Sequence, residues 1–445
     1  MKVFGYKVPH VILHPVLRAI ATNTSWLLAD KVVRMFLGVV VGAWMARHLG
    51  PEQYGELSYA IAFTAFFQAL ATLGLDGITV RDLSNRPDQT RAILGTVARL
   101  RLVASVAGWI AACGIVSFLR PDDIRTLALV ALISGGLLFQ SADVIDLWFQ
   151  SQTRSRHAAL ARSVAFIVST GIRASLIIAE SSLWAFAITQ IFESALTAFL
   201  LIRTFRRHSS VSNWEWQQSF ALRSLRSGAP LLLSSLSIVA YLRIDQLMLK
   251  GMAGDGTLGL YSAALSFSQA WYVIPVALCA SAMPALTRIY AEDRAAYYRR
   301  LQILFSGLAW MSLVIAGGMA LGADWIVRNL LGPQYLAASK ITQIHVFTNF
   351  FVFLGVAQTQ WILSEERTNL ALTKTMAGAL ISVLGNLILI PAYGAQGAAV
   401  ASLAAHGTSA VFCNAILAPR IFRMQVQAVF MPFLWLVRSI QRRET

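Results

Sequence analysis

The sequence predicts an all-α polytopic membrane protein with about twelve transmembrane helices arranged in two six-helix lobes. Of its 445 residues, 57% are hydrophobic and only 13% are charged, and the mean hydropathy is +0.61. Soluble domains are about 45–50% apolar and about 25% charged. Apolar segments long enough to cross a bilayer recur along the chain, and basic residues gather in alternate connections between them. These three observations exclude a soluble globular protein.

The spanning segments are predicted by their length, because a helix needs about 20 apolar residues to cross roughly 30 Å of hydrocarbon. Twelve segments satisfy this requirement, and no connection between them is long enough for a soluble domain. In chain order they are residues 24–47, 54–76, 93–118, 124–148, 158–179, 183–203, 227–250, 258–286, 301–321, 336–363, 368–391 and 396–418.

The distribution of Lys and Arg predicts the orientation of these segments, because cytoplasmic loops of membrane proteins are enriched in both residues. With both termini cytoplasmic, the connections on that side carry 24 of the 37 basic residues and the opposite connections carry 6. The net charge of +16 is therefore spread over loops and not concentrated in a basic domain, so no nucleic acid partner is expected. We expect a multi-pass protein surrounded by membrane lipids, with both termini in the cytoplasm.

An internal repeat predicts the two lobes. GELSYA at 55–60 and GLYSAA at 259–264 are 204 residues apart, and each opens an even-numbered span. The same offset places the first span on the seventh, and repeats of this kind hold substrate sites at the interface between halves. The predicted division is an N-terminal lobe at 1–203, a cytoplasmic linker at 204–226, a C-terminal lobe at 227–418 and a basic interfacial tail at 419–445.

Three phrases carry a family resemblance. RHLGPEQYGELSYA at 47–60 is similar to the turn after the first helix of bacterial polysaccharide flippases, and LLGPQYLAAS at 330–339 is similar to their outer turn before the tenth helix. NLILIPAYGAQGAAVAS at 386–402 resembles the connection between the last two helices across a wider group. The chain thus resembles the Wzx-like flippases of the multidrug/oligosaccharidyl-lipid/polysaccharide exporter superfamily.

The resemblance implies a MATE-like bundle of two lobes that works by alternating access. It implies that the cargo is an undecaprenyl-diphosphate-linked oligosaccharide, moved across the bacterial inner membrane for the synthesis of O-antigen, capsule or exopolysaccharide. A polysaccharide polymerase and glycosyltransferases are the implied protein partners, and we expect the flippase itself to be a monomer.

Basic residues inside the spans are the strongest functional signal that the residues themselves give. A charged side chain at the bilayer centre costs about 2.5–3.5 kcal/mol, so most of them are expected to face protein or water. They outnumber the acidic residues of the spans, and a surplus of cations suits a diphosphate because arginine binds phosphate oxygens bidentately. The seven are Lys31, Arg34, Arg99, Arg101, Arg162, Arg173 and Arg243.

Depth and helix face select among these cations. Arg34, Arg173 and Arg243 lie deepest, and Arg99 and Arg101 point about 200° apart, so the latter two are not expected to face one cavity. For each, pairing with a carboxylate of the bundle is the structural alternative. The predicted contacts of the cavity or diphosphate are Arg34, Arg173, Arg243, Lys31, Arg99 and Arg101.

Carboxylates inside the spans have two interpretations. Asp30 lies one helical turn before Arg34 and is expected to be its local counter-ion. Glu193 and Asp245 are the deeper carboxylates, and each either carries a coupling proton or sodium ion or simply balances an arginine. No other cofactor is expected.

No catalytic or metal site is predicted, because the sequence contains no HExxH, GxSxG or phosphate-loop motif. Three alternatives to the flippase interpretation remain open. A cation-coupled multidrug exporter of the same superfamily favours acidic residues deep in the first lobe, and a flippase for the peptidoglycan precursor more often carries two further helices. A membrane polysaccharide polymerase or ligase is expected to have a large outer loop, and the longest outer segment here is about 322–335.

Overall fold

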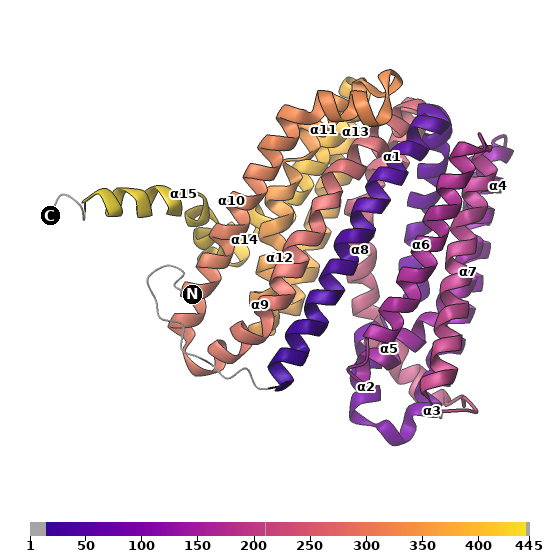
Figure 1. The fold of residues 1–445 in the computed structure, drawn as a ribbon, viewed down its shortest axis with the longest axis horizontal. Coiled ribbons are helices and arrows are strands. Elements are labelled where there is room, and N and C mark those ends of the chain that lie inside the picture. The colour runs from indigo at the N-terminus through magenta and orange to yellow at the C-terminus, as the bar shows by residue number, and fades with distance from the viewer. Residues whose placement is uncertain (1–14, 210, 442–445) are drawn as a thin grey trace.

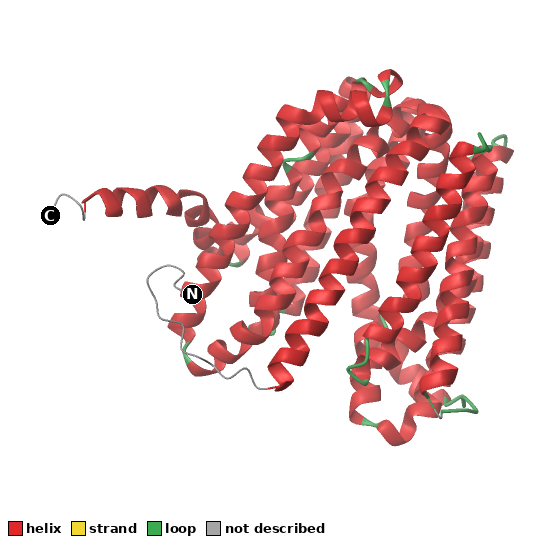
Figure 2. Ribbon diagram, viewed as in Figure 1, coloured by secondary structure: helices red, strands yellow, loops and turns green. Residues whose placement is uncertain are grey.

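Helices make up almost all of the structure. The computed structural model describes the backbone of residues 15–209 and 211–441, and the side chains of residues 33–209, 211–367 and 369–430. Within these residues every regular element is a helix and none is a strand, as Figure 2 shows. The all-α fold class is therefore confirmed.

The helices follow one another with short connections (Figure 1). In the first half they are α1 (Pro15–Thr72), α2 (Asp76–Asn85), η1 (Pro87–Gln89), α3 (Thr90–Leu119), α4 (Ile124–Ser134), η2 (Gly135–Asp143), α5 (Val144–Ser151), α6 (Arg156–Ile178) and α7 (Leu183–His208). In the second half they are α8 (Gln218–Gln269), η3 (Ala270–Tyr272), α9 (Val273–Glu292), α10 (Arg294–Ile326), η4 (Val327–Leu331), η5 (Pro333–Tyr335), α11 (Ala337–His345), α12 (Thr348–Ser364), α13 (Thr368–Gly407), η6 (Thr408–Phe412), α14 (Cys413–Leu417) and α15 (Pro419–Gln441).

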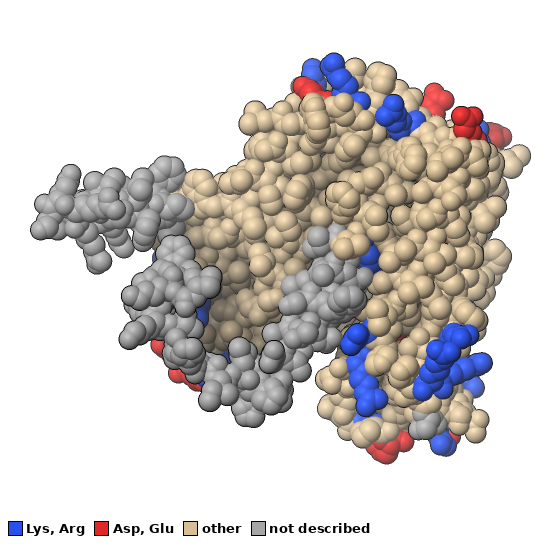
Figure 3. Space-filling view, in the orientation of Figure 1, with Lys and Arg blue, Asp and Glu red and all other residues tan. Residues whose placement is uncertain are grey.

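The described residues contain nine continuous helical stretches that are long and apolar enough to cross a membrane. Figure 3 shows charged side chains mainly at the two ends of the helices, with a nearly uncharged band between them. Large apolar side chains of the helices are exposed on the outside of the bundle, such as Val314 on α10, which is 70% exposed. A multi-pass membrane protein is therefore confirmed, whereas the count of twelve spans stays a prediction.

Three of the nine stretches are interrupted by glycine, at positions where the sequence predicts outer turns. Gly50 in α1 has φ 74° and ψ 168°, and Gly254 in α8 has φ 84° and ψ 173°. Only glycine adopts this backbone region without strain, so each long helix folds back at its glycine. Gly394 interrupts α13 in a similar way. Gly50 and Gly254 are 204 residues apart, which is the offset of the internal repeat.

The repeat is also visible in how α1 packs on α8. A Cβ placed on Gly55 would lie 1.9 Å from the Asp255 carbonyl oxygen, and a Cβ on Gly259 would lie 1.8 Å from the Pro51 carbonyl oxygen. The 204-residue offset maps Gly55 onto Gly259 and Pro51 onto Asp255, so each contact is the repeat-related counterpart of the other. The helices therefore meet as two related halves. The absence of side chains at both glycines is what allows the backbones to touch.

The apolar cores show where the two halves of the chain are joined. One core contains buried residues of both halves and surrounds the predicted outer turns, with members such as Leu57, Leu258 and Ala398. Towards the opposite end there are two separate cores, one drawn from residues between 75 and 220 and the other from residues between 279 and 428. The halves therefore share a large core at one end, whereas at the other end only the start of α8 packs against the first half, through Phe220 and Gly228. Figure 1 shows α3 and α9 lying far apart.

The connection between the halves is shorter than the predicted linker, because α7 continues to His208 and α8 already begins at Gln218. Its residues pack on α3: the Gln217 backbone N–H donates to the Thr96 hydroxyl at 3.0 Å. After the bundle, α15 projects sideways from it (Figure 1). The boundaries at 203, 227 and 418 stay a prediction.

Candidate functional site

A polar cavity of about 260 Å³ lies among α1, η2, α6 and α7 in the first half of the chain. This volume is just below the roughly 300–1,000 Å³ of typical small-molecule pockets. Apart from its charged residues, the polar groups in its wall are amides and hydroxyls, namely those of Thr64, Gln68, Gln140, Gln190, Ser194 and Thr197.

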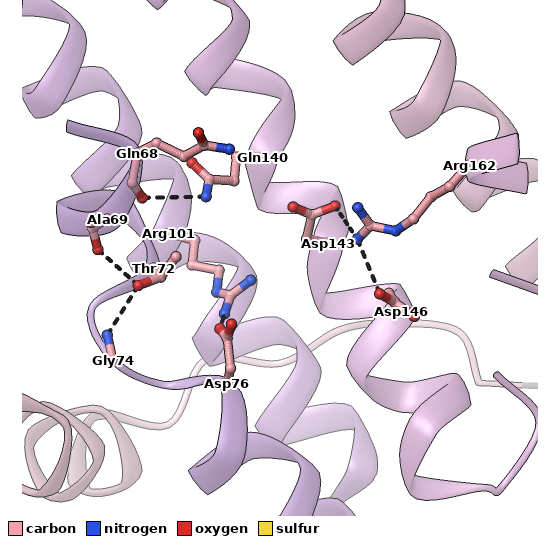
Figure 4. Close-up of polar contacts among 10 residues, drawn as sticks. All are labelled: Gln68, Ala69, Thr72, Gly74, Asp76, Arg101, Gln140, Asp143, Asp146 and Arg162. Carbon is pink, nitrogen blue, oxygen red and sulfur yellow. Dashed lines mark hydrogen bonds and ion pairs between the residues drawn. The ribbon is translucent and has the colours of Figure 1, made fainter. Parts of the chain in front are cut away.

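Some of these polar atoms are left without a partner. The Gln140 side-chain nitrogen donates to the Gln68 backbone carbonyl at 3.3 Å, which orients the amide (Figure 4). The Gln140 side-chain oxygen and the Thr64 hydroxyl are buried and have no hydrogen-bond partner among the described residues. Unpaired buried polar atoms are unfavourable, so these two are available to hydrogen-bond a ligand such as a sugar hydroxyl.

Two arginines hold the cavity wall together through ion pairs. The Arg162 guanidinium on α6 lies 2.9 Å from an Asp143 oxygen and 3.0 Å from an Asp146 oxygen, and Figure 4 shows it reaching between the two carboxylates. Arg173, almost three turns further along α6, pairs with Glu193 of α7 at 2.7 Å. Its guanidinium also donates to the Gln190 side-chain oxygen at 3.0 Å. Both arginines therefore have their charge balanced inside the protein.

Arg34 differs from these two arginines. It lies in the cavity wall on α1, half-buried, with its guanidinium 4.9 Å from the centre of the Phe166 ring. Among the described side chains, no carboxylate lies within ion-pairing distance of it. The side chains of Asp30 and Lys31, its predicted counter-ion and neighbour, lie outside the described residues. Arg34 thus brings a positive charge and its donors to a cavity whose other arginine, Arg162, is paired with carboxylates.

Arg99 and Arg101 lie outside this cavity. The Arg101 side chain is 2% exposed and pairs with Asp76 at the start of α2, as Figure 4 shows. Arg99 is exposed and donates to the Trp214 backbone carbonyl at 3.3 Å. The two side chains lie in different surroundings, as expected from positions about 200° apart on one helix.

Arg243 and Asp245 are also outside the cavity, on α8 in the second half of the chain. Arg243 is half-buried, and it forms no ion pair with Asp245. Asp245 is 1% exposed and accepts hydrogen bonds from the Tyr261 hydroxyl and, at 2.7 Å, from the Gln246 backbone N–H. Its carboxylate is therefore held by neutral donors.

Of the predicted cation contacts, Arg34 lines this cavity, whereas Arg99, Arg101, Arg173 and Arg243 are not in its wall. Carboxylates of the bundle balance Arg101, Arg162 and Arg173, two of which are predicted contacts. The physical reason is that a buried cation without a partner costs several kcal/mol, so the fold supplies counter-ions from neighbouring helices. Asp76, the partner of Arg101, gave no signal in the sequence because it lies at the predicted end of a span.

Comparison with known proteins identifies the family. Residues 20–290 match the family described as polysaccharide biosynthesis protein, which is more than half of the chain. The chain belongs to the polysaccharide biosynthesis protein family. A curated relative is the probable flippase AglR of Haloferax volcanii, 20% identical over 385 residues that cover 84% of this chain and 78% of AglR.

Solved structures of other proteins show the same fold. The lipid II flippase MurJ in an inward closed conformation superposes with a TM-score of 0.71 at 14% identity, covering 95% of this chain and 93% of MurJ. A MATE family multidrug transporter of the MOP superfamily in its inward-facing conformation gives a TM-score of 0.67 at 14% identity, covering 89% and 95%. This member of the polysaccharide biosynthesis protein family therefore has the MurJ and MATE fold.

A buried cation that sequence reasoning missed joins the two halves of this family member at their shared end. The Lys250 side chain is 1% exposed and lies 2.8 Å from an Asp255 oxygen and 3.7 Å from an Asp123 oxygen. It also donates to the Thr126 hydroxyl at 2.7 Å. In the sequence, Lys250 is the last residue of the predicted span 227–250 and was counted with the outer connection, which gave no indication that the fold would bury it.

Proposed function

We propose that this protein is a flippase that moves an undecaprenyl-diphosphate-linked oligosaccharide repeat unit across the bacterial inner membrane. The observation that carries the proposal is the polar cavity, where amide and hydroxyl groups suited to sugars surround Arg34, a cation without a described carboxylate partner. Arginine binds phosphate oxygens with two parallel hydrogen bonds, so Arg34 is the diphosphate contact in this proposal. The protein acts as a transporter and not as an enzyme.

The names of the related proteins support a lipid-linked sugar as the cargo. AglR is named a probable flippase, and the MurJ structure is that of a lipid II flippase. The family description refers to polysaccharide biosynthesis. A lipid-linked sugar is the cargo class that combines these names, and we propose it for this chain.

Alternating access is the proposed transport cycle. The halves share a large core around the predicted outer turns, and Lys250 adds an ion-pair contact between them there. A cavity closed at this end is reached from the opposite end, which we assign to the cytoplasm because the predicted topology places 24 basic residues there. Transport then requires the contact at Gly55 and Gly259 to open and the opposite ends to approach.

Asp245 is the better candidate for a coupling ion site. Glu193 is held by the fixed cation of Arg173, and protonating it would leave that arginine unbalanced. Asp245 is held by a tyrosine hydroxyl and a backbone N–H and forms no ion pair among the described residues, so its protonation removes a charge from the protein interior without breaking a salt bridge. We propose a proton as the ligand of Asp245, and we propose that the flippase works as a monomer between glycosyltransferases and a polymerase.

The test of the function combines a deletion strain with a reconstituted assay. We expect the deletion to abolish surface polysaccharide and to accumulate a lipid-linked repeat unit that remains inaccessible from the outside. Purified protein in proteoliposomes is expected to move that same lipid between leaflets without forming new glycosidic bonds, which separates it from a polymerase or ligase. Intact surface polysaccharide together with lost efflux of cationic dyes would refute the proposal in favour of a multidrug exporter.

A further inference from the structure

A second cavity, of about 320 Å³, lies in the second half of the chain among α8, α12, α13 and η6. Most of its wall is apolar, with side chains such as Ile238, Phe351 and Val356. Two basic side chains, Lys374 and His406, interrupt this apolar wall. An apolar pocket with a few convergent polar groups is the general pattern of a ligand site.

Lys374 is a buried basic side chain without a described counter-ion. Its side chain is on α13, it is 4% exposed, and its ammonium group donates to the Gln358 side-chain oxygen. No described carboxylate lies within ion-pairing distance of it. A buried ion without an opposite charge costs several kcal/mol, so the ammonium group in this cavity favours binding of an anion.

The neighbouring amides hold Lys374 in place. The Gln358 side-chain nitrogen donates to the Asn414 side-chain oxygen at 2.8 Å, and Asn414 donates back to the Gln358 oxygen at 3.1 Å. Asn414 also donates to the Gln425 side-chain oxygen at 2.8 Å. Every amide in this set is buried. The ammonium group is therefore held by a fixed oxygen and keeps two N–H donors for a ligand.

His406 presents a free nitrogen to the same cavity. Its Nδ1 lies 2.8 Å from the Ser402 backbone carbonyl, which only accepts hydrogen bonds, so Nδ1 carries the proton of the neutral ring. Its Nε2 is buried and has no hydrogen-bond partner among the described residues. A neutral His406 therefore offers an acceptor to the cavity, and a protonated His406 offers a donor.

The groups around His406 do not supply a negative charge. Tyr241 of α8 contacts it at 5.1 Å between ring centres, and His345 of α11 lies 6.5 Å away. On its own helix, Lys374 lines the same cavity, and Cys413 of α14 lies close to Lys374. A proton on His406 in the empty cavity is therefore opposed by Lys374, and an anion between the two removes that repulsion.

We propose that this cavity is an anion subsite, in which Lys374 and protonated His406 together bind the oxygens of a phosphate or carboxylate group. Binding takes one proton from water onto His406 Nε2, while Nδ1 keeps its proton on the Ser402 carbonyl, and release of the anion returns the proton to water. The physiological ligand rests on the proposed function: it is either the diphosphate of the lipid carrier or the carboxylate of an acidic sugar.

The first test uses sulfate, because its charge does not change between pH 6 and pH 8. We expect calorimetry on the detergent-purified full-length protein, at constant ionic strength with chloride, to show sulfate binding about tenfold tighter at pH 6 than at pH 8. Binding at pH 7 should take up protons, measured as a dependence of the heat on the ionisation enthalpy of the buffer. Absence of sulfate binding by the wild-type protein would overturn the proposal.

Variants separate the two side chains. Lys374→Gln is expected to weaken sulfate at least tenfold at both pH values, and Lys374→Arg should retain binding and so reports on folding. His406→Gln should bind as the wild type does at pH 8 and lose the gain at pH 6. Lys340→Gln, at an exposed lysine outside the cavity, should change nothing. Unchanged sulfate affinity in Lys374→Gln, or an unchanged pH dependence in His406→Gln, would refute the assignment.

Two further ligands distinguish the source of the anion. Competition by inorganic diphosphate but not by glucuronate assigns the subsite to the lipid carrier, and the reverse result assigns it to an acidic sugar. Failure of both to compete with sulfate would overturn the assignment to a cargo anion. Sulfate binding that depends on Lys374, in a protein that moves no lipid-linked oligosaccharide, would instead refute the proposed function and leave the subsite in place.

Discussion

Adding one methyl group at Gly259 should open the outer end of the molecule. A Cβ at this position would lie 1.8 Å from the Pro51 carbonyl oxygen, and ordinary contact begins at 3.4 Å. The helices must therefore separate by about 1.6 Å, and both sides of the contact are backbone, so no flexible side chain can yield. Overpacking of this kind costs about 1–3 kcal/mol, which corresponds to roughly a 5–150-fold shift towards conformations in which α1 and α8 are apart.

The assay for Gly259→Ala is accessibility of a buried reporter. Ala46 is 1% exposed in the core that both halves share. We expect Ala46→Cys, in a background lacking the three native cysteines, to react with a membrane-impermeant maleimide added from outside several-fold faster when Gly259→Ala is present. Transport of the lipid-linked cargo should fall, because the cavity spends less time open to the cytoplasm.

A matched control lies three residues earlier. A Cβ on Gly256 would meet only the Glu52 side chain, at 3.6 Å. Gly256→Ala should therefore leave labelling and transport as they are, with a stability gain of up to about 1 kcal/mol from better helix propensity. Wild-type labelling and transport in Gly259→Ala would show that the contact with Pro51 does not hold the outer end closed.

Three further predictions concern charged residues. Arg34→Ala should abolish transport at normal protein levels, and Arg34→Lys should restore it partly. Transport is measured as lipid flipping in proteoliposomes, with Arg288→Ala, at an exposed arginine, as the control. Full activity of both Arg34 variants would refute the role of Arg34. Arg173→Ala should lower the free energy of unfolding by about 1–3 kcal/mol because it leaves the Glu193 carboxylate without its ion-pair partner. Adding Glu193→Gln should recover part of the loss in a thermal unfolding assay. Additive losses would contradict the pairing. Lys250→Met should destabilise the closed outer end by about 1–2 kcal/mol, since the carboxylates of its ion pairs are partly exposed. It should also raise the labelling of Ala46→Cys from outside, as Gly259→Ala does. Unchanged labelling would show that the ion pairs form without holding the lobes together.

The sequence was most informative where the physics is local. Gly50 and Gly254 interrupt their helices at predicted outer turns, because glycine preference for unusual backbone angles depends only on the residue itself. The 204-residue repeat likewise appeared in the sequence before it appeared in the contacts of Gly55 and Gly259. Length and hydropathy were sufficient to identify the membrane-spanning class.

The partners of charged residues were the least accessible to sequence reasoning. Arg173 and Glu193 were ranked as possible cavity contact and possible ion site, and the structure pairs them at 2.7 Å across α6 and α7. Lys374 lies near the start of the predicted span 368–391 and was not counted among the seven basic residues inside the spans, whereas the structure buries it almost two turns inside α13. In both cases the decisive fact is which neighbouring helix faces the charge.

The sequence by itself therefore determined that this chain crosses a membrane many times, where it turns, and that it consists of two related halves. These properties follow from the transfer free energy of apolar segments and from backbone preference, both of which act along the chain. Only the tertiary structure decided which cations are neutralised and which remain available to a ligand. Electrostatic energy in a low-dielectric interior depends on distances of a few ångströms between groups far apart in sequence, so it is set by packing.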